Sequence, residues 1–205
     1  MLFVRRLMRN RAELRVRNPS RVLSYISRAI VARAKLSHSD ARGRARMVDV
    51  AAKAETLREA VASAEVVMQP ATLRLVEQAV GARGKGDVLA VARLAGVMAA
   101  KRTADLIPLC HPVRLVGCDL ELDSDRALPG VRIQARARAV DRTGVEMEAM
   151  VAVAVAALTV YDMVKGAERG VEIRGVRLEE KQGGKSGVWK RRPGSKPIDI
   201  GRSSK

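Results

Sequence analysis

The sequence predicts an α+β fold in which helices pack on one face of an antiparallel sheet. Residues 131–139 alternate strictly between apolar side chains and Arg or Gln, and this period of two is typical of a strand with one buried face. Residues 148–166 are rich in Ala and Val and predict a long helix. The order of all predicted elements, β-α-α-β-β-α-β, indicates a ferredoxin-like arrangement.

The first half of this region is predicted to contain one strand and two helices. Residues 60–68 predict the strand, and residues 71–82 predict a helix because apolar residues recur there at helical spacing. Residues 87–106 predict a second, longer helix. Gly84 and Gly86 separate the two helices and leave Lys85 on the turn between them.

The second half is predicted to contain three strands and the long helix. Residues 115–122 predict a strand that turns Val116, Cys118, Leu120 and Leu122 to one face. Residues 123–130 form the turn before the alternating strand, and residues 171–178 form the last strand. The long helix is apolar on more of its circumference than one sheet face covers, so we expect an oligomer that buries the remainder.

Composition and charge narrow the class of protein. The chain has 205 residues, 47% of them hydrophobic, and only two cysteines, which favours a globular protein without a disulfide framework. The net charge of +17 is uneven, because residues 1–46 carry 13 basic and 2 acidic residues while residues 47–180 carry 18 and 19. The folded region is therefore close to neutral, which argues against a nucleic-acid-binding face. No charge-free apolar run is long enough to predict a membrane span.

The two ends are predicted to be appendages of the domain at 36–188. Residues 1–35 hold nine arginines and a single acid, Glu13, which is typical of an organelle transit peptide and would place the protein in the mitochondrial matrix. A basic tail or a start codon assigned too far upstream explains the same segment, and the protein would then be cytoplasmic. Residues 189–205 are predicted to be a basic, flexible tail.

A rare pair of side chains, Cys110 and His111, lies between Pro108 and Pro112. Proline restricts itself and the preceding residue to non-helical backbone, so we expect a stiff, extended turn. Adjacent residues on extended backbone point in opposite directions, which argues against a nucleophile–base pair. Two histidines and two cysteines give no recognised zinc-ligand spacing, so a substrate-contacting histidine is the better hypothesis.

The charged residues allow two interpretations. Glu146 and Glu148 stabilise a helix N-terminus by charge, or share a site if their segment is extended; spacing alone favours the first. Asp162 and Lys165 share a helix face as a surface ion pair or as the wall of a polar cavity. Lys85 is a phosphate contact or a solvated lysine. The run 183–187, Gly-Gly-Lys-Ser-Gly, lacks the first glycine of a P-loop, since Glu179 occupies that position.

Seven short motifs give a more specific indication. They are Met47-Val48-Asp49-Val50, Lys85-Gly86-Asp87-Val88, Ala99-Ala100-Lys101-Arg102-Thr103, Leu106-Ile107-Pro108-Leu109-Cys110-His111-Pro112, Gly144-Val145-Glu146-Met147-Glu148-Ala149, Ala156-Ala157-Leu158-Thr159-Val160-Tyr161-Asp162-Met163 and Gly183-Gly184-Lys185-Ser186-Gly187. In order and spacing they resemble the cyclic pyranopterin monophosphate synthase family of molybdenum cofactor biosynthesis. The resemblance runs from about residue 36 to residue 187.

The resemblance implies a reaction and an assembly. The family converts 3′,8-cyclo-7,8-dihydroguanosine 5′-triphosphate to cyclic pyranopterin monophosphate and releases pyrophosphate, which makes it a lyase. It implies no cofactor, no metal, no nucleic acid and no membrane. It also implies a homohexamer, a trimer of dimers with sites at subunit interfaces, and a functional link to the radical enzyme that makes the substrate.

The resemblance also assigns roles to residues. Asp162 is implied to be the catalytic acid/base, with Lys165 as its partner and Lys85 in the catalytic group. The residues implied to contact the substrate are Leu109, Cys110, His111, Glu146, Met147, Glu148, Lys181 and Arg58. The alternatives are a catalytically inactive assembly or regulatory subunit of the same fold, and a basic nucleic-acid-binding protein.

Overall fold

A computed structural model describes residues 37–40, 42–80 and 86–192. The chain divides into two units, residues 1–46 and residues 47–205. The described part of the first unit is a short turn, in which Ser39 bridges Ala45 and Asp40 accepts hydrogen bonds from the backbone of Arg42 and Arg44. The predicted appendage at 1–35, most of the tail at 189–205, and Lys85 lie outside the described residues.

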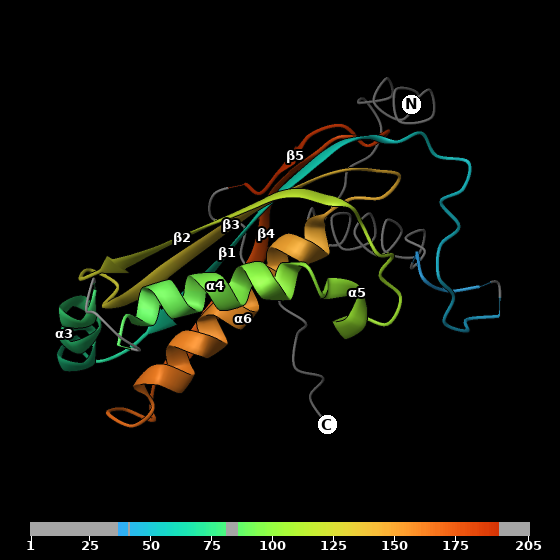
Figure 1. Ribbon diagram of the computed structural model, residues 1–205. Coiled ribbons are helices and arrows are strands. Elements are labelled where there is room, and N and C mark those ends of the chain that lie inside the picture. Colours follow the sequence, from blue (N-terminus) through green and yellow to red (C-terminus); the bar gives the residue numbers. More distant parts are fainter. Residues whose placement is uncertain (1–36, 41, 81–85, 193–205) are drawn as a thin grey trace, which may run out of the picture. The chain divides into compact units, whose positions relative to one another are not determined.

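The second unit contains a five-stranded antiparallel sheet in the order β2-β3-β1-β4-β5 (Figure 1). The four strands lie in the order β2-β3-β1-β4, with helices between β1 and β2 and between β3 and β4 and a hairpin between β2 and β3. This is the ferredoxin-like arrangement, so the predicted fold class is confirmed. The short β5 adds a strand beyond β4. The strands are β1 Thr56–Val67, β2 Leu115–Asp125, β3 Gly130–Asp141, β4 Glu172–Gln182 and β5 Trp189–Lys190.

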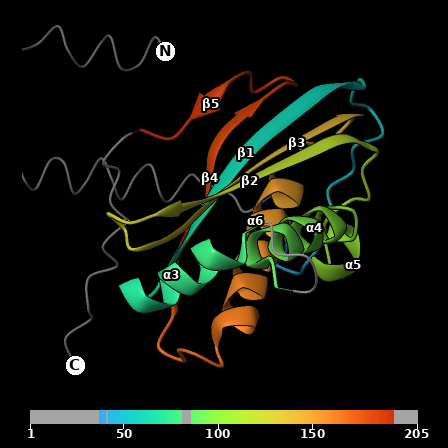
Figure 2. The same ribbon diagram turned by 60° about the vertical axis from the view of Figure 1, so that its left-hand side comes forward.

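Helices cover one face of this sheet, as both views of the chain show (Figures 1 and 2). Helix α6 packs on β1, β3 and β4, and α4 lies beside α6 and contacts β2. The helices are α3 Pro70–Ala79, α4 Val88–Ala100, α5 Thr103–Leu106 and α6 Glu146–Val164. Asp87 caps α4, because its side chain accepts a hydrogen bond from the N–H of Ala90 at 2.9 Å.

The core is built from small side chains, which let the layers approach closely. The predicted inward positions of the alternating strand, Val131 to Ala139, are buried. They face alanines of α6, among them Ala149, Ala152 and Ala156. On α4, a Cβ at Gly96 would lie 2.3 Å from Leu120 Cδ2 and 2.8 Å from the carbonyl oxygen of Ala152, so only glycine fits between α4, α6 and β2.

Three sequence predictions need correction. The predicted helix 87–106 breaks after Ala100, where the Thr103 hydroxyl donates to the carbonyl of Ala100 at 3.0 Å and α5 begins on a new axis. Val116 is 63% exposed rather than inward, because the β2–β3 register shifts between Leu115 and Gly117. The predicted turn 123–130 shortens to residues 126–129, since both flanking strands continue into it.

Helix α6 begins at Glu146 and is long and apolar enough to cross a membrane by length and composition. Half of that window is buried inside the fold, and a core helix passes the same test. The outward side of the helical layer stays apolar, with Leu94 and Met98 of α4 and Leu158 of α6 each more than half exposed. This surface is the one that the predicted oligomer would cover.

Candidate active site

The two glutamates of the sequence prediction lie in the first turn of α6, which begins at Glu146 directly after the turn from β3. Two residues along a helix correspond to a rotation of about 200°, so their side chains diverge. Glu146 lines a cavity, whereas Glu148 is only 1% exposed and turns into the fold. The structure therefore gives the two acids different surroundings at the same helix end.

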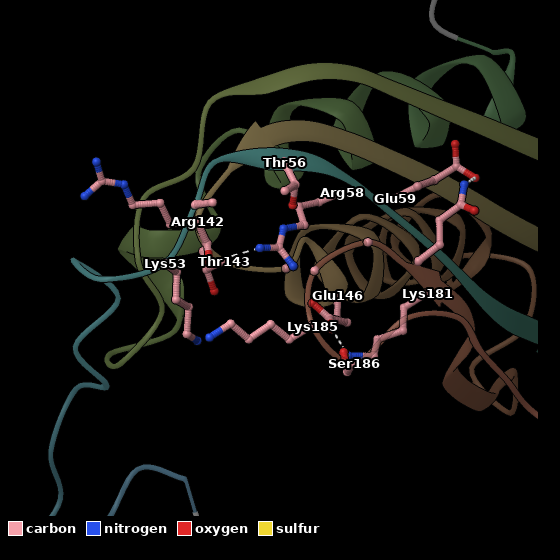
Figure 3. A pocket seen from close by; sticks show the side chains of 15 residues that line it. Lys53, Thr56, Arg58, Glu59, Arg142, Thr143, Glu146, Lys181, Lys185 and Ser186 are labelled. Atoms are coloured by element: carbon pink, nitrogen blue, oxygen red, sulfur yellow. Dashed lines mark hydrogen bonds and ion pairs between the residues drawn. The ribbon is translucent and has the colours of Figure 1, made fainter.

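The cavity that Glu146 lines has a volume of about 620 Å³ (Figure 3). Its walls come from the segment before β1, from β1, from the β3–α6 turn and from the β4–β5 loop. Cationic side chains dominate it, since five basic residues line it against two acids. The lining residues are Lys53, Ala54, Thr56, Arg58, Glu59, Arg142, Thr143, Gly144, Glu146, Lys181, Gln182, Gly183, Gly184, Lys185 and Ser186.

Two glycines shape the β4–β5 loop on one side of the cavity. Gly183 and Gly184 have φ values of 102° and 68°, which side chains with a Cβ rarely adopt. Next to them, Lys181 at the end of β4 donates to the hydroxyl of Ser186 at 2.9 Å and pairs with Glu146 across the cavity at 3.3 Å. The ammonium group of Lys181 thus links the β4–β5 loop to the first turn of α6.

Sequence reasoning missed several cationic residues of this cavity. Lys53 and Arg142 were not predicted to be site residues, and Lys185 appeared only as part of a glycine-rich run. Arg142 donates to the carbonyl oxygen of Ala51 at 3.2 Å, which ties the segment before β1 to the β3–α6 turn. The position of Lys53, just after the first quoted motif, could have indicated that Lys53 is a site residue. No local pattern marks Arg142, since its role depends on the turn that carries it.

Glu148 is the most strongly perturbed acid near this turn. Burial, helped by the negative charge of Glu146, raises the pKa of its carboxyl group to about 7, and hydrogen bonding from the backbone of Glu148 itself opposes this shift. Its Oε2 atom is buried without a hydrogen-bond partner among the described residues. A carboxyl group with this pKa can release or accept a proton near neutral pH.

Cys110 lies against Glu148, with its Sγ donating to Oε1 over 3.9 Å. Burial and the nearby charge of Glu148 raise the pKa of the Cys110 thiol to about 11, so the thiol stays protonated at neutral pH. A protonated thiol is a poor nucleophile, which agrees with the sequence argument against a Cys–His dyad. Leu109 and His111 flank Cys110 on the half-buried segment between α5 and β2.

Asp162 and Lys165 lie at the other end of α6. Their side chains form an ion pair of 2.6 Å and are 69% and 55% exposed, which within one chain is a surface pair. Asp162 is sixteen residues from Glu146, which corresponds to about 24 Å along a helix. The chain therefore brings Glu146, Glu148, Cys110, Lys181 and Arg58 to one end of α6 and leaves Asp162 and Lys165 at the other.

No group of three or more His, Cys, Asp or Glu residues suited to a metal ion occurs in the part of the chain that the structure describes. The described site offers cations for an anionic ligand and carboxyl groups for proton transfer.

Comparison with known proteins decides the family. The model of the MoaC family matches residues 47–184, which include all residues that line the cavity except Lys185 and Ser186. The chain belongs to the MoaC family. Among curated relatives, the cyclic pyranopterin monophosphate synthase of Methylobacterium sp. (strain 4-46) is 59% identical over 156 residues, covering 76% of this chain and 96% of the relative.

Two further MoaC-family relatives carry the same name. The protein of Thermomicrobium roseum is 57% identical over 158 residues, covering 77% of this chain and 94% of its own length. The protein of Brucella ovis is 55% identical over 155 residues, covering 76% and 93%. About three quarters of this chain therefore matches nearly the whole length of each relative.

Proposed function

We propose that this chain is a cyclic pyranopterin monophosphate synthase, a lyase that converts cyclic dihydroguanosine triphosphate to the cyclic pyranopterin and releases pyrophosphate. The observation that carries the proposal is the cationic cavity beside the buried acid Glu148, on a chain 55–59% identical to enzymes of that name. An inactive subunit would not need these charged and proton-exchanging side chains.

The cavity suits the triphosphate of the substrate. Lys53, Lys181 and Lys185, with Arg142, supply positive charge for a polyphosphate and for the pyrophosphate that leaves it. Ring closure at the α-phosphate requires a substrate hydroxyl to lose its proton, form an O–P bond and break the bond to the β-phosphate oxygen. Cations that neutralise the leaving pyrophosphate lower the barrier to this step.

Rearrangement of the base requires further proton transfers. Glu148 is suited to them because its pKa of about 7 lets it both give and accept a proton. Asp162 is the other proposed acid/base, and Lys165 donates to it at 2.6 Å. Since the two acids lie at opposite ends of α6, a single substrate molecule does not span both within one chain.

We infer that a neighbouring subunit supplies Asp162 and Lys165 to each cavity. The exposed apolar residues of α4 and α6 support a subunit contact on this side of the sheet. This arrangement agrees with the homohexamer, a trimer of dimers, that the resemblance implies, and with sites at subunit interfaces.

The decisive experiment is single-turnover conversion of the cyclic dihydro-GTP substrate by the purified chain, with pyrophosphate and pterin product both measured. Wild type is expected to form product, and Asp162→Asn and Lys165→Ala are expected to form none while keeping the oligomer. Equal turnover in all three proteins would refute the catalytic role of Asp162 and Lys165. An intact wild-type oligomer without turnover would favour the inactive subunit.

Mixing two inactive variants tests the shared site. Asp162→Asn and Glu148→Gln subunits, unfolded together and reassembled at equal amounts, are expected to recover about a quarter of wild-type activity, because that fraction of shared sites contains both native residues. No recovery in mixed oligomers, verified by mass, would place both acids in the same subunit's site.

A further inference from the structure

Arg58 lies between the two loops that form the cavity. Its Nε atom donates to the carbonyl oxygen of Asp141 at 3.2 Å, and its Nη2 atom donates to the carbonyl oxygen of Arg142 at 3.3 Å. The first carbonyl belongs to the last residue of β3 and the second to the turn that leads into α6, and Figure 3 shows the guanidinium group extending from β1 toward this turn. The side chain thus fixes the backbone that starts α6.

The opposite side of the same guanidinium group contacts the β4–β5 loop. A Cβ at Gly184 would lie 1.7 Å from Nη1 of Arg58, and a Cβ at Gly183 would lie 2.3 Å from the carbonyl oxygen of Leu57. The loop therefore closes on Arg58 only because these positions are glycine. Arg58 is held between a turn that carries Glu146 and a loop that carries Lys185.

We propose that Arg58 is a positioning residue that sets the distance between the first turn of α6 and the β4–β5 loop, rather than a direct ligand of the substrate phosphates. This inference differs from the substrate-contacting role that the resemblance implied for Arg58, and its catalytic part rests on the proposed function. Arginine suits the role because its planar fork donates to two carbonyl groups at once, which a single ammonium group does not reproduce.

The spacing matters because groups from both sides must meet one substrate. Lys181 already spans the gap, since it contacts Ser186 of the loop at 2.9 Å and Glu146 of α6 at 3.3 Å. A shift of about 1 Å between such groups is enough to lower a rate constant by roughly a hundredfold. Loss of Arg58 would therefore lower kcat more than it weakens binding.

The test compares Arg58→Lys, Arg58→Met and Gly184→Ala in the full chain. Hydrogen exchange of the backbone in residues 143–148 reports the first turn of α6 without reference to activity, and calorimetry with inorganic pyrophosphate reports the cavity's affinity for anions. All three variants are expected to exchange at least about threefold faster in this turn. Their pyrophosphate Kd is expected to change less than about twofold, and their kcat to fall at least about tenfold with KM little changed.

Two matched variants separate the alternatives. Gly187→Ala introduces the same kind of backbone strain, since Gly187 has a φ of 65°, but its Cβ would meet no atom within 4 Å, so exchange in the α6 turn is expected to stay as in wild type. Lys53→Met removes a cavity cation and is expected to weaken pyrophosphate binding. The proposal is overturned if Arg58→Met behaves like Lys53→Met, with unchanged exchange and weaker pyrophosphate binding. An inactive wild type with the expected exchange pattern would refute the proposed function while leaving the positioning role intact.

Discussion

Glu148→Gln is expected to make the protein more stable at alkaline pH while removing its activity. The amide of glutamine resembles the neutral carboxyl group in size and is never charged. In the wild type, burial holds the pKa of Glu148 at about 7, against an ordinary value of 4.5 for a glutamate. Between about pH 4.5 and pH 7, the folded protein therefore keeps the proton on the Glu148 carboxyl group, whereas the unfolded chain releases it.

The sign of the effect follows from that difference. Between about pH 4.5 and pH 7 the folded state holds more protons than the unfolded state, so the free energy of unfolding falls as pH rises. A difference of roughly 2.5 pKa units corresponds to about 3 kcal/mol, and about 2 to 3 kcal/mol of it is lost between pH 5 and pH 8. The free energy of unfolding of Glu148→Gln should not show this fall between pH 5 and pH 8.

The assay is urea denaturation of wild type and Glu148→Gln at pH 5 and pH 8, at one protomer concentration because the stability of an oligomer depends on it. Glu146→Gln, at the same end of α6 but lining the cavity, is the comparison; it should keep most of the wild-type pH dependence, because burial is the main cause of the raised pKa of Glu148 and the charge of Glu146 is a smaller one. Equal pH dependence in wild type and Glu148→Gln would refute the reasoning. Alkylation of Cys110 gives a second readout, since removing the charge of Glu148 lowers the pKa of the thiol and should speed its reaction.

Further predictions concern packing and charge. Gly96→Ala should lower the free energy of unfolding by about 1–3 kcal/mol, because its Cβ would overlap Leu120 and Ala152; thermal unfolding checks this, with Gly166→Ala, which meets no atom within 4 Å, as the control. Lys181→Ala should weaken pyrophosphate binding measured by calorimetry, because its ammonium group lines the cavity. Lys190→Ala should leave that affinity unchanged, since Lys190 pairs with Glu180 and does not line the cavity; equal effects of the two lysine variants would contradict the assigned anion site.

Much of the fold could be predicted from local sequence patterns. The alternating segment 131–139 is β3 with its apolar side chains buried, and the Ala- and Val-rich segment is α6. Both signals are periodic, and periodicity depends only on the geometry of one helix or strand. The break after Ala100 was missed because a threonine side chain of α5 that bonds back to the end of α4 leaves no trace in the hydrophobic pattern.

The site was predicted in part. A quoted motif indicated Glu146 and Glu148, the family resemblance indicated Lys181, and the structure places these residues at one end of α6. The roles of the predicted site residues stay predictions, and Lys85 lies outside the described residues. Arg142 and Lys53 were missed, because a turn and the segment before β1 bring their side chains to the cavity without any periodic pattern.

The sequence by itself determined the class of fold, the apolar faces and the set of chemically useful side chains. Only the tertiary structure decided which of them meet. Helical spacing put Asp162 beside Lys165 and far along the same helix from Glu146, but it could not show that Lys181, from the end of β4, pairs with Glu146 at 3.3 Å. It also could not show that Glu148, two residues from Glu146, is buried against Cys110 with a pKa near 7. Distances between segments, and the desolvation that shifts a pKa, arise from packing between parts of the chain that no local pattern encodes.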